Sequence, residues 1–490
     1  RRIDIGPVNA RLARAFSCTR IAIARAGQGT SMRDVDAAIA ANRFGLGARP
    51  GELRALGSTA RDALRAWLAE PPPRLEAPLK PSHEVLAAAL ARREAAAAAA
   101  ADPREAEVAN AVATLRDIYA PVYQAETLAR FRHAVATGRG FIERLVHFWS
   151  NHFAVSVDKL AVLGLAGALE REAIRPHVLG HFADMLLAVE KHPAMLLYLD
   201  NARSAGPDSR LARAAGRRGR APGLNENLGR EILELHTLGV DGGYTQQDVR
   251  AMAMLVTGWS IGGGEGALQG GEPGRFHFRE ALHQPGSKVL LGRRHAEAGV
   301  EEGEQALRML ALHPATARHL ATKLVRHFLA DDPPPALVSR VARAYLESEG
   351  HLGQACAALV DAPETWSTPL AKYKTPADYI HSAYRALGLA VGEHDPRLFA
   401  ELGQRIFQPG SPAGWPDTAA GWDGAAALMK RLEWAQEAAA RLGSTRDARE
   451  LARQALGPTW SARSDEAVMR AQDAAQALAL FLGSPEFMRR

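Results

Sequence analysis

Apolar residues recur at helical spacing along most of the chain. The segment 32–45 places Val35, Ile39 and Phe44 on one side of a helix that the final glycine ends. Residues 84–120 also favour helix, but they are rich in Ala and carry few large side chains. We therefore expect an exposed, Ala-rich helical arm over 84–120.

A change of period occurs after a Gly-rich break at 261–274. The runs RFHFRE, from 275, and SKVLLG, ending at 292, alternate apolar and polar residues as strands do. We predict one small β-hairpin near 275–292. Helical spacing resumes from 301, so the predicted fold class is mostly α, a multi-helix globular protein with that one hairpin.

Proline, glycine and charge runs mark the expected boundaries. The first 31 residues hold a single acid, Asp4, and the first methionine is Met32, which favours a start codon assigned too far upstream. We expect five parts: 1–31, a disordered or mis-assigned N-terminal extension; 32–202, an N-terminal helical lobe with the arm; 203–222, an Arg-rich flexible loop; 223–385, a central helical lobe with the hairpin; and 386–490, a C-terminal helical region.

Composition narrows the class of protein only slightly. The 490 residues include 60 Lys and Arg and 54 Asp and Glu, a net charge of +6 that does not demand a nucleic-acid partner. Two cysteines cannot build a disulfide framework or a Cys-based zinc site.

The longest apolar run, 160–169, is stopped by Glu170, so no transmembrane segment is expected. Two locations stay open: the cytoplasm, because no clear export signal is present, and the periplasm, through co-export with a partner.

The stretch GLNENLGREILELHTLGVDGGYTQQD at 223–248 concentrates acids and a histidine. At about 100° per residue, Glu226, Glu231 and Glu234 share one arc of a helix, and His236 lies opposite among aliphatic residues. An ordinary explanation is a solvated face with a Glu226–Arg230 pair, and a core histidine bonded to a backbone carbonyl. That explanation leaves Glu231 without a partner. Thr245 and Asp248 have the spacing of a capping box that opens the next helix.

A second polar cluster lies in FIERLVHFWSNHF at 141–153. His147 and Asn151 are four residues apart, a spacing that lets two side chains of one helix approach the same ligand. If this helix packs antiparallel to that of 225–238, His147 and Glu231 could share a divalent ion, zinc, manganese or iron. A buried hydrogen-bond network, with Arg144 and Arg230 neutralising the acids, is the alternative.

The candidate site residues fall into three groups. The catalytic candidates are Glu231, Glu234 and His147. The metal candidates are His147 and Glu231. The binding candidates are Asn151, His152, Asn227, His236 and Asp200.

Several blocks of sequence resemble the bacterial family called domain of unknown function 1800. The blocks, in chain order, are RFGLGARPGE at 43–52, FWSNHF at 148–153, HPAMLLYLDN at 192–201, NENLGREILELHTLGVDGGYTQQDV at 225–249, LVTGWS at 255–260, HLATKLVRHF at 319–328, KTPADY at 374–379 and PAGWPDTAAGW at 412–422. The resemblance covers essentially 32–490. It implies a largely helical fold and a bacterial source, and it supplies no activity. Members of the family tend to be encoded beside a sulfatase-like family, which suggests a partner.

Two functions from different classes follow. The first is a metal-assisted hydrolase or oxidoreductase with its site between the 141–153 and 225–238 helices. The second is a non-catalytic helical partner or escort of a sulfatase-like envelope protein, in which the same polar residues hold the lobes together. No Ser-centred elbow, dinucleotide fingerprint or HExxH motif decides between them.

Overall fold

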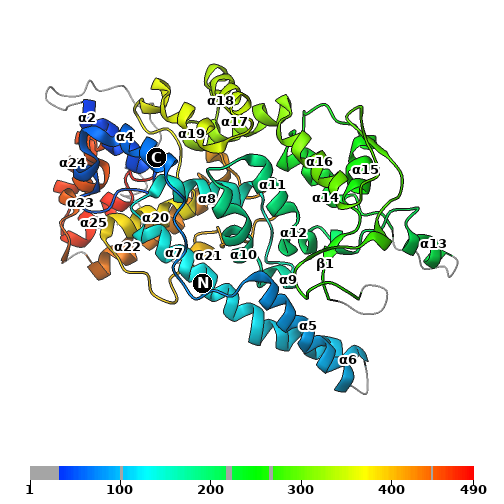
Figure 1. Cartoon of the computed structure of the whole chain (residues 1–490). Coiled ribbons are helices and arrows are strands. Elements are labelled where there is room, and N and C mark those ends of the chain that lie inside the picture. The colour runs from blue at the N-terminus through cyan, green and yellow to red at the C-terminus, as the bar shows by residue number, and fades with distance from the viewer. Residues whose placement is uncertain (1–31, 100–102, 217–222, 264–268, 443–444) are drawn as a thin grey trace.

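Helices build nearly all of the molecule. A computed structural model describes residues 32–99, 103–216, 223–263, 269–442 and 445–490 (Figure 1). The described chain is mostly helical with two small antiparallel sheets, which confirms the predicted fold class. The N-terminal extension predicted at 1–31 lies outside the described residues.

The first helices form one end of the body and the arm. Ile39 and Phe44 are fully buried, as their helical spacing predicts. Where the sequence predicts an Ala-rich arm, α5 and α6 lie side by side and extend away from the body (Figure 1). The elements are α2 (Met32–Ile39), η1 (Ala40–Phe44), α3 (Glu52–Leu56), η2 (Gly57–Thr59), α4 (Ala60–Ala69), α5 (Ser82–Ala99), α6 (Pro103–Thr114), η3 (Leu115–Tyr119) and α7 (Ala120–Ala136).

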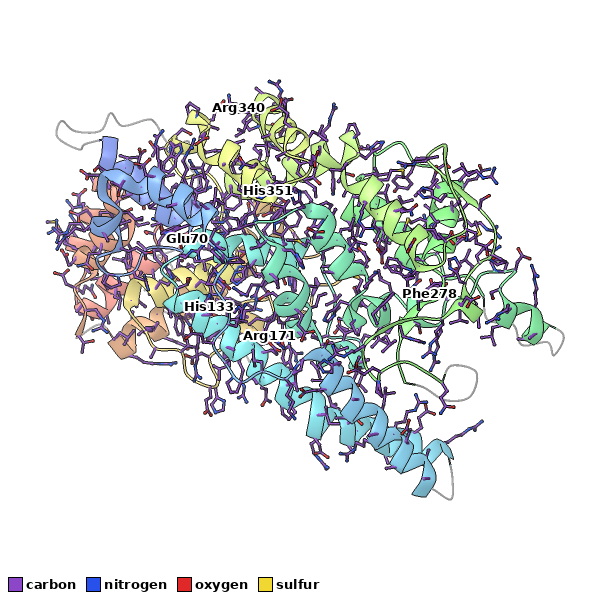
Figure 2. All side chains as sticks on the ribbon, viewed as in Figure 1. Glu70, His133, Arg171, Phe278, Arg340 and His351 are labelled. Carbon is purple, nitrogen blue, oxygen red and sulfur yellow. The ribbon has the colours of Figure 1, made fainter. Side chains whose placement is uncertain are left out.

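The next part contains α8, which crosses the centre of the molecule and is buried on nearly all sides (Figure 1). Arg171, labelled in Figure 2, joins this region to α7 through an ion pair with Glu126, 2.9 Å between Nη2 and Oε1. The elements are α8 (Gly140–His152), α9 (Leu160–Leu163), α10 (Ala166–Leu169), η4 (Glu170–Ile174), η5 (Arg175–His177), α11 (Phe182–Glu190), α12 (Pro193–Tyr198), η6 (Asn201–Arg203) and α13 (Arg210–Gly216). The apolar run 160–169 becomes two short helices, and no helix of the described residues has the length and apolarity to cross a bilayer.

The Arg-rich segment 203–222 differs from the predicted flexible loop in its described part. Residues Arg210–Gly216 form α13, which packs near η9. Ser209 begins the helix, because its Oγ accepts a hydrogen bond from the backbone N–H of Ala212 (3.2 Å), and Ala212 is buried. The remainder of the predicted loop, 217–222, lies outside the described residues.

Two of the four strands lie in the alternating runs, but they do not pair with each other as predicted: each pairs with a strand outside 275–292, which gives two ladders instead of one. Phe276–Phe278 pairs with Trp259–Ile261, and Lys288–Leu290 pairs with Arg293–His295. The second ladder closes at Leu291–Gly292, both with positive φ (48° and 75°), as a tight two-residue hairpin requires. The elements are α14 (Asn227–Glu231), η7 (Ile232–His236), α15 (Gln246–Leu255), β1 (Trp259–Ile261), β2 (Phe276–Phe278), η9 (Glu280–Leu282), β3 (Lys288–Leu290) and β4 (Arg293–His295).

Two hydrophobic cores lie within the described chain. The larger draws on buried residues from Ala37 to Leu370, and the smaller on Phe131 and residues between Tyr379 and Met488. The remaining elements are α16 (Val300–Ala311), α17 (Pro314–Phe328), α18 (Pro335–Glu347), α19 (Leu352–Val360), η10 (Pro363–Trp366), α20 (Pro376–Leu387), α21 (Arg397–Glu401), η11 (Ala419–Gly421), α22 (Ala425–Leu442), α23 (Ala448–Leu456), η13 (Gly457–Thr459), α24 (Ala462–Met469) and α25 (Ala474–Leu482). The division into lobes stays a prediction, since the larger core includes residues from both sides of 203–222.

The turn after η1 holds α8 and α20 in place. Arg144 of α8 donates from Nε to the carbonyl of Gly45 (2.7 Å), and Arg385 of α20 donates from Nε to the carbonyl of Gly47 (2.6 Å). Gly47 has φ +96°, and a Cβ there would lie 2.6 Å from the Cβ of Ser382. Only glycine fits that approach, so the turn fixes the spacing between the two helices.

Candidate active site

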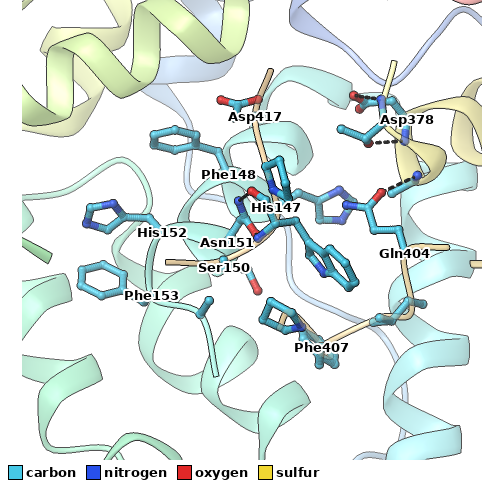
Figure 3. A pocket seen from close by; sticks show the side chains of 18 of the residues that line it. His147, Phe148, Ser150, Asn151, His152, Phe153, Asp378, Gln404, Phe407 and Asp417 are labelled. Carbon is cyan, nitrogen blue, oxygen red and sulfur yellow. Dashed lines mark hydrogen bonds between the residues drawn. The ribbon is translucent and has the colours of Figure 1, made fainter. Parts of the chain in front are cut away.

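A cavity of about 400 Å³ lies between α8, α17, the start of α20 and the segment 399–417 (Figure 3). Its aromatic walls include Phe148, Phe407 and Trp415. Its polar lining comes from several separate parts of the chain: Arg130 of α7; Arg144, His147, Asn151 and His152 of α8; Lys323 and His327 of α17; Asp378 and His381 of α20; and Gln404, Arg405 and Asp417 of the following segment.

Helical spacing explains what α17 presents to the cavity. Lys323 and His327 are four residues apart and therefore lie on the same side of the helix. The opposite side buries Ala321 and Val325 in the larger core. Burial of that apolar side fixes the rotation of α17, so the two polar side chains face the cavity.

His327 and Asp417 form a histidine–carboxylate pair. Nδ1 of His327 lies 3.2 and 3.3 Å from the two carboxylate oxygens of Asp417. Burial lowers the pKa of His327 to about 4, so the imidazole is neutral at pH 7 and carries its proton on Nδ1, where it is donated to Asp417. Burial alone would raise the pKa of Asp417, but His327, Lys372 and Arg490 hold it at about 2. Nε2 of His327 has no hydrogen-bond partner among the described residues.

Asp378 is held by two arginines. Its oxygens accept from Nη1 of Arg144 (2.7 Å) and from Nε of Arg490 (2.8 Å), and all three side chains are buried. Against the effect of burial, the two guanidinium groups keep the pKa of Asp378 well below its usual range. Asp378 also completes a capping box with Thr375 at the start of α20. Its role is to fix α8 and α20 against each other.

Lys323 lies beside a neutral histidine. Its Nζ is 2.9 Å from Nδ1 of His152, and Nε2 of His152 is 3.1 Å from the backbone carbonyl of His236. The carbonyl can only accept, so the ring proton of His152 is on Nε2, and Nδ1 accepts from Lys323. Burial, with the nearby Lys323, lowers the pKa of His152 well below its usual value, which keeps this ring neutral.

Asn151 holds the segment that closes one side of the cavity. Its Nδ2 donates to the carbonyl of Trp415 (3.0 Å), and its Oδ1 accepts from the N–H of Trp415 (2.7 Å). The adjoining Gly414 has φ +83°, and a Cβ there would lie 2.3 Å from the carbonyl oxygen of Asn151. The residue predicted to bind a ligand therefore binds the backbone of this chain.

The predicted cluster of 225–238 contributes differently. His236 is a core residue, as its apolar surroundings predict, but Nδ1 bonds to the buried carboxylate of Glu190 (2.7 Å) in place of a backbone carbonyl. Glu231 and Glu234 are half-buried outside the cavity lining. Burial, with the nearby Glu234, raises the pKa of Glu231. The predicted Glu226–Arg230 pair is present at 3.5 Å.

The other two binding candidates lie at the surface. Asn227 is exposed at the start of α14, where its N–H donates to Asn225 Oδ1 (2.9 Å). The side chain of Asp200 is 67% exposed and pairs with Lys159. Neither residue lines the cavity.

The helices at 141–153 and 225–238 meet through His152 and the His236 carbonyl, and not through the predicted metal pair. Nε2 of His147 lies 3.3 Å from Glu143 Oε1, and its ring stacks on His381 at 5.1 Å between centroids. Glu231 instead lies near His236, Glu234 and Arg230. No three His, Cys, Asp or Glu side chains of the described chain are placed to hold one metal ion. The donor set expected for zinc, manganese or iron therefore does not fit this arrangement.

Sequence reasoning missed Lys323, His327, Asp378 and Asp417. Two signals in the sequence were available. Lys323 and His327 are four residues apart, and Asp417 lies in a segment rich in Pro, Gly and Trp, a composition typical of functional loops. Their convergence could not be read from the sequence, because Asp417 and its partner are 90 residues apart.

Several of the residues that line the cavity lie in the blocks that carry the family resemblance. FWSNHF supplies Asn151 and His152, HLATKLVRHF supplies Lys323 and His327, and PAGWPDTAAGW supplies Asp417. No curated protein and no solved structure shows a significant match to the chain. The model of the family described as "Protein of unknown function (DUF1800)" matches residues 39–489, nearly the whole chain, and the protein belongs to this family.

Proposed function

We propose that this protein is a hydrolase whose active site is the cavity between α8, α17 and α20. One observation carries the proposal: His327, oriented by Asp417, lines the cavity, and its buried Nε2 has no hydrogen-bond partner among the described residues. A carboxylate-oriented neutral imidazole is the arrangement that general acid–base catalysis uses.

The chemistry follows from the proton positions. Nδ1 of His327 donates to Asp417, so the lone pair on Nε2 can take a proton from water as the water oxygen attacks an ester carbonyl or similar centre. The imidazolium formed is stabilised by the Asp417 carboxylate. The same proton then passes from Nε2 to the leaving group as its bond to the acyl carbon breaks. His327 is the catalytic residue in this scheme, and Asp417 is a positioning residue.

The proposal replaces the site first expected between the 141–153 and 225–238 helices. It keeps the 141–153 helix and pairs it with α17 and the 399–417 segment. An oxidoreductase would need a redox group, and the proposal is confined to acid–base chemistry, which the residues of the cavity supply themselves.

The alternative function, a partner or escort of a sulfatase-like envelope protein, draws on a different feature. On the arm, α6 exposes Val108 and Val112, 67% and 59% accessible and four residues apart on one side. Exposed apolar residues on a projecting element are typical of protein contacts. A purely structural partner would not depend on His327.

The test compares wild type with His327→Ala, Asp417→Asn and, as the matched control, His394→Ala, a surface histidine. A panel of chromogenic carboxylic, phosphoric and sulfuric esters is assayed at pH 7. We expect turnover by wild type and the control, and a loss in kcat of about 10²–10⁴-fold in His327→Ala. Asp417→Asn should lower kcat with little change in KM. Absence of turnover by wild type on every ester, or equal activity of the two Ala variants, would refute the proposal and favour the partner role.

A further inference from the structure

Lys323 stands in the cavity without a carboxylate partner. Within the described part of the chain its contact is to Nδ1 of His152, a neutral acceptor, and its Nζ forms no ion pair with a carboxylate of the described residues. Asp417 is close enough to influence the pKa of Lys323 but forms no ion pair with it. A half-buried ammonium group with only a neutral partner is costly, because desolvation is not repaid by an opposite charge.

The carboxylates around the cavity are already occupied. Asp378 binds Arg144 and Arg490, and Asp417 accepts from His327 and lies 3.8 Å from Nζ of Lys372. Four cationic side chains line the cavity against two carboxylates: the cations are Arg130, Arg144, Lys323 and Arg405, and the carboxylates are Asp378 and Asp417. Arg130 is paired with Glu170, which lies outside the lining. Arg405 is exposed to solvent and contacts Tyr123. The buried uncompensated charge therefore centres on Lys323.

We infer that the cavity is a binding site for an oxyanion, a carboxylate, phosphate or sulfate group of a small organic molecule, with Lys323 as its anchor. This inference rests on the proposed function, since it names the charge that the substrate carries. A cavity of about 400 Å³ is in the size range of small-molecule sites. The aromatic walls, Phe148, Phe407 and Trp415, would enclose the rest of the molecule.

The hydrogen bond to His152 orients the anchor. Because Nδ1 of His152 accepts one N–H of Lys323, two further donors remain for an anion. Burial lowers the pKa of Lys323 to about 8, and the ammonium form still predominates at pH 7. His152 cannot turn away easily, since its Nε2 is held by the carbonyl of His236.

Calorimetry and thermal shift with sodium acetate, phosphate and sulfate, at pH 7 and constant ionic strength set with sodium chloride, test the inference. We expect at least one of the three anions to bind wild type, and Lys323→Met to bind it about 10- to 100-fold more weakly, as loss of one charged hydrogen bond implies. The control Lys430→Met removes the same charge from the exposed face of α22 and should bind like wild type. Lys323→Arg keeps the charge and should retain binding within a few fold.

The outcomes separate this inference from the hydrolase proposal. His327→Ala should bind the anion like wild type, because binding does not need the acid–base group. If the anion binds and depends on Lys323 while no ester is turned over, the oxyanion site stands and the hydrolase proposal falls. If wild type hydrolyses neutral esters and Lys323→Met has the same KM and anion affinity as wild type, the oxyanion site is wrong. No binding of any of the three anions to folded wild type would also overturn it.

Discussion

Replacing Asn151 by Ala should release the 408–418 segment from the cavity. The side chain makes two hydrogen bonds to the backbone of Trp415, at 3.0 and 2.7 Å. Each such bond contributes about 1 kcal/mol, so the local free energy of opening should fall by about 2 kcal/mol. At 1.4 kcal/mol for a tenfold change, that corresponds to about 30-fold faster exchange of the Trp415 amide hydrogen.

Hydrogen exchange with mass spectrometry on peptides covering 408–418 measures this change. Ser150→Ala is the matched control, because Ser150 precedes Asn151 on α8 and also lines the cavity. Gly414→Ala tests the same contact from the other side, since its new Cβ would lie 2.3 Å from the carbonyl oxygen of Asn151 in a backbone conformation with φ +83°. If both variants leave the exchange of this segment unchanged, the segment is held by its other contacts and the argument for Asn151 is wrong.

Two further predictions concern buried charge. The pKa of His327 is about 4 in the folded protein and about 6.5 in the unfolded chain. As the pH falls, the unfolded chain binds the proton first, so the free energy of unfolding should fall by up to about 3 kcal/mol between pH 6.5 and pH 4. Urea unfolding of wild type and His327→Gln at pH 7 and pH 4.5 checks this, and an equal acid loss in both proteins would contradict it. Glu143 is fully buried and accepts two hydrogen bonds from Arg175 at 2.6 and 2.9 Å, so Glu143→Gln should cost about 3–5 kcal/mol in the same assay. Adding Arg175→Met should recover part of that loss, and a Glu143→Gln variant as stable as wild type would show that the pair contributes nothing.

Local features of the fold were accessible from the sequence. The burial of Ile39 and Phe44 follows from their spacing, and the Thr245–Asp248 capping box is present with both of its hydrogen bonds. These features depend on residues within one or two helical turns of each other. Two of the four strands, β2 and β3, were located, but not their partners. The pairing of β3 with β4 depends on Leu291 adopting positive φ beside Gly292, an uncommon conformation for a leucine.

The helix at 227–236 is not a regular α-helix throughout, so side-chain directions calculated at 100° per residue do not hold along its whole length. Its second half, Ile232–His236, is a π turn, which adds a residue to the turn and changes the direction of the side chains that follow. His236 nevertheless reaches the core, because Glu190 of α11 supplies a buried acceptor. No pattern within the 223–248 stretch could indicate a partner on another helix.

A cluster of polar residues in one short stretch and a site assembled across a cavity have different physical origins. In one stretch, acids and bases compensate each other at helical spacing, as Glu226 and Arg230 do. Groups that act on a bound molecule must instead face it from several sides, so they come from separate elements. The polar residues of α17 follow the second pattern. His327 pairs with a carboxylate on a distant segment, and Lys323 has no carboxylate partner among the described residues. The half-buried charge of Lys323 is the basis of the proposed anion site, because the cost of desolvating it would be offset when an anion binds.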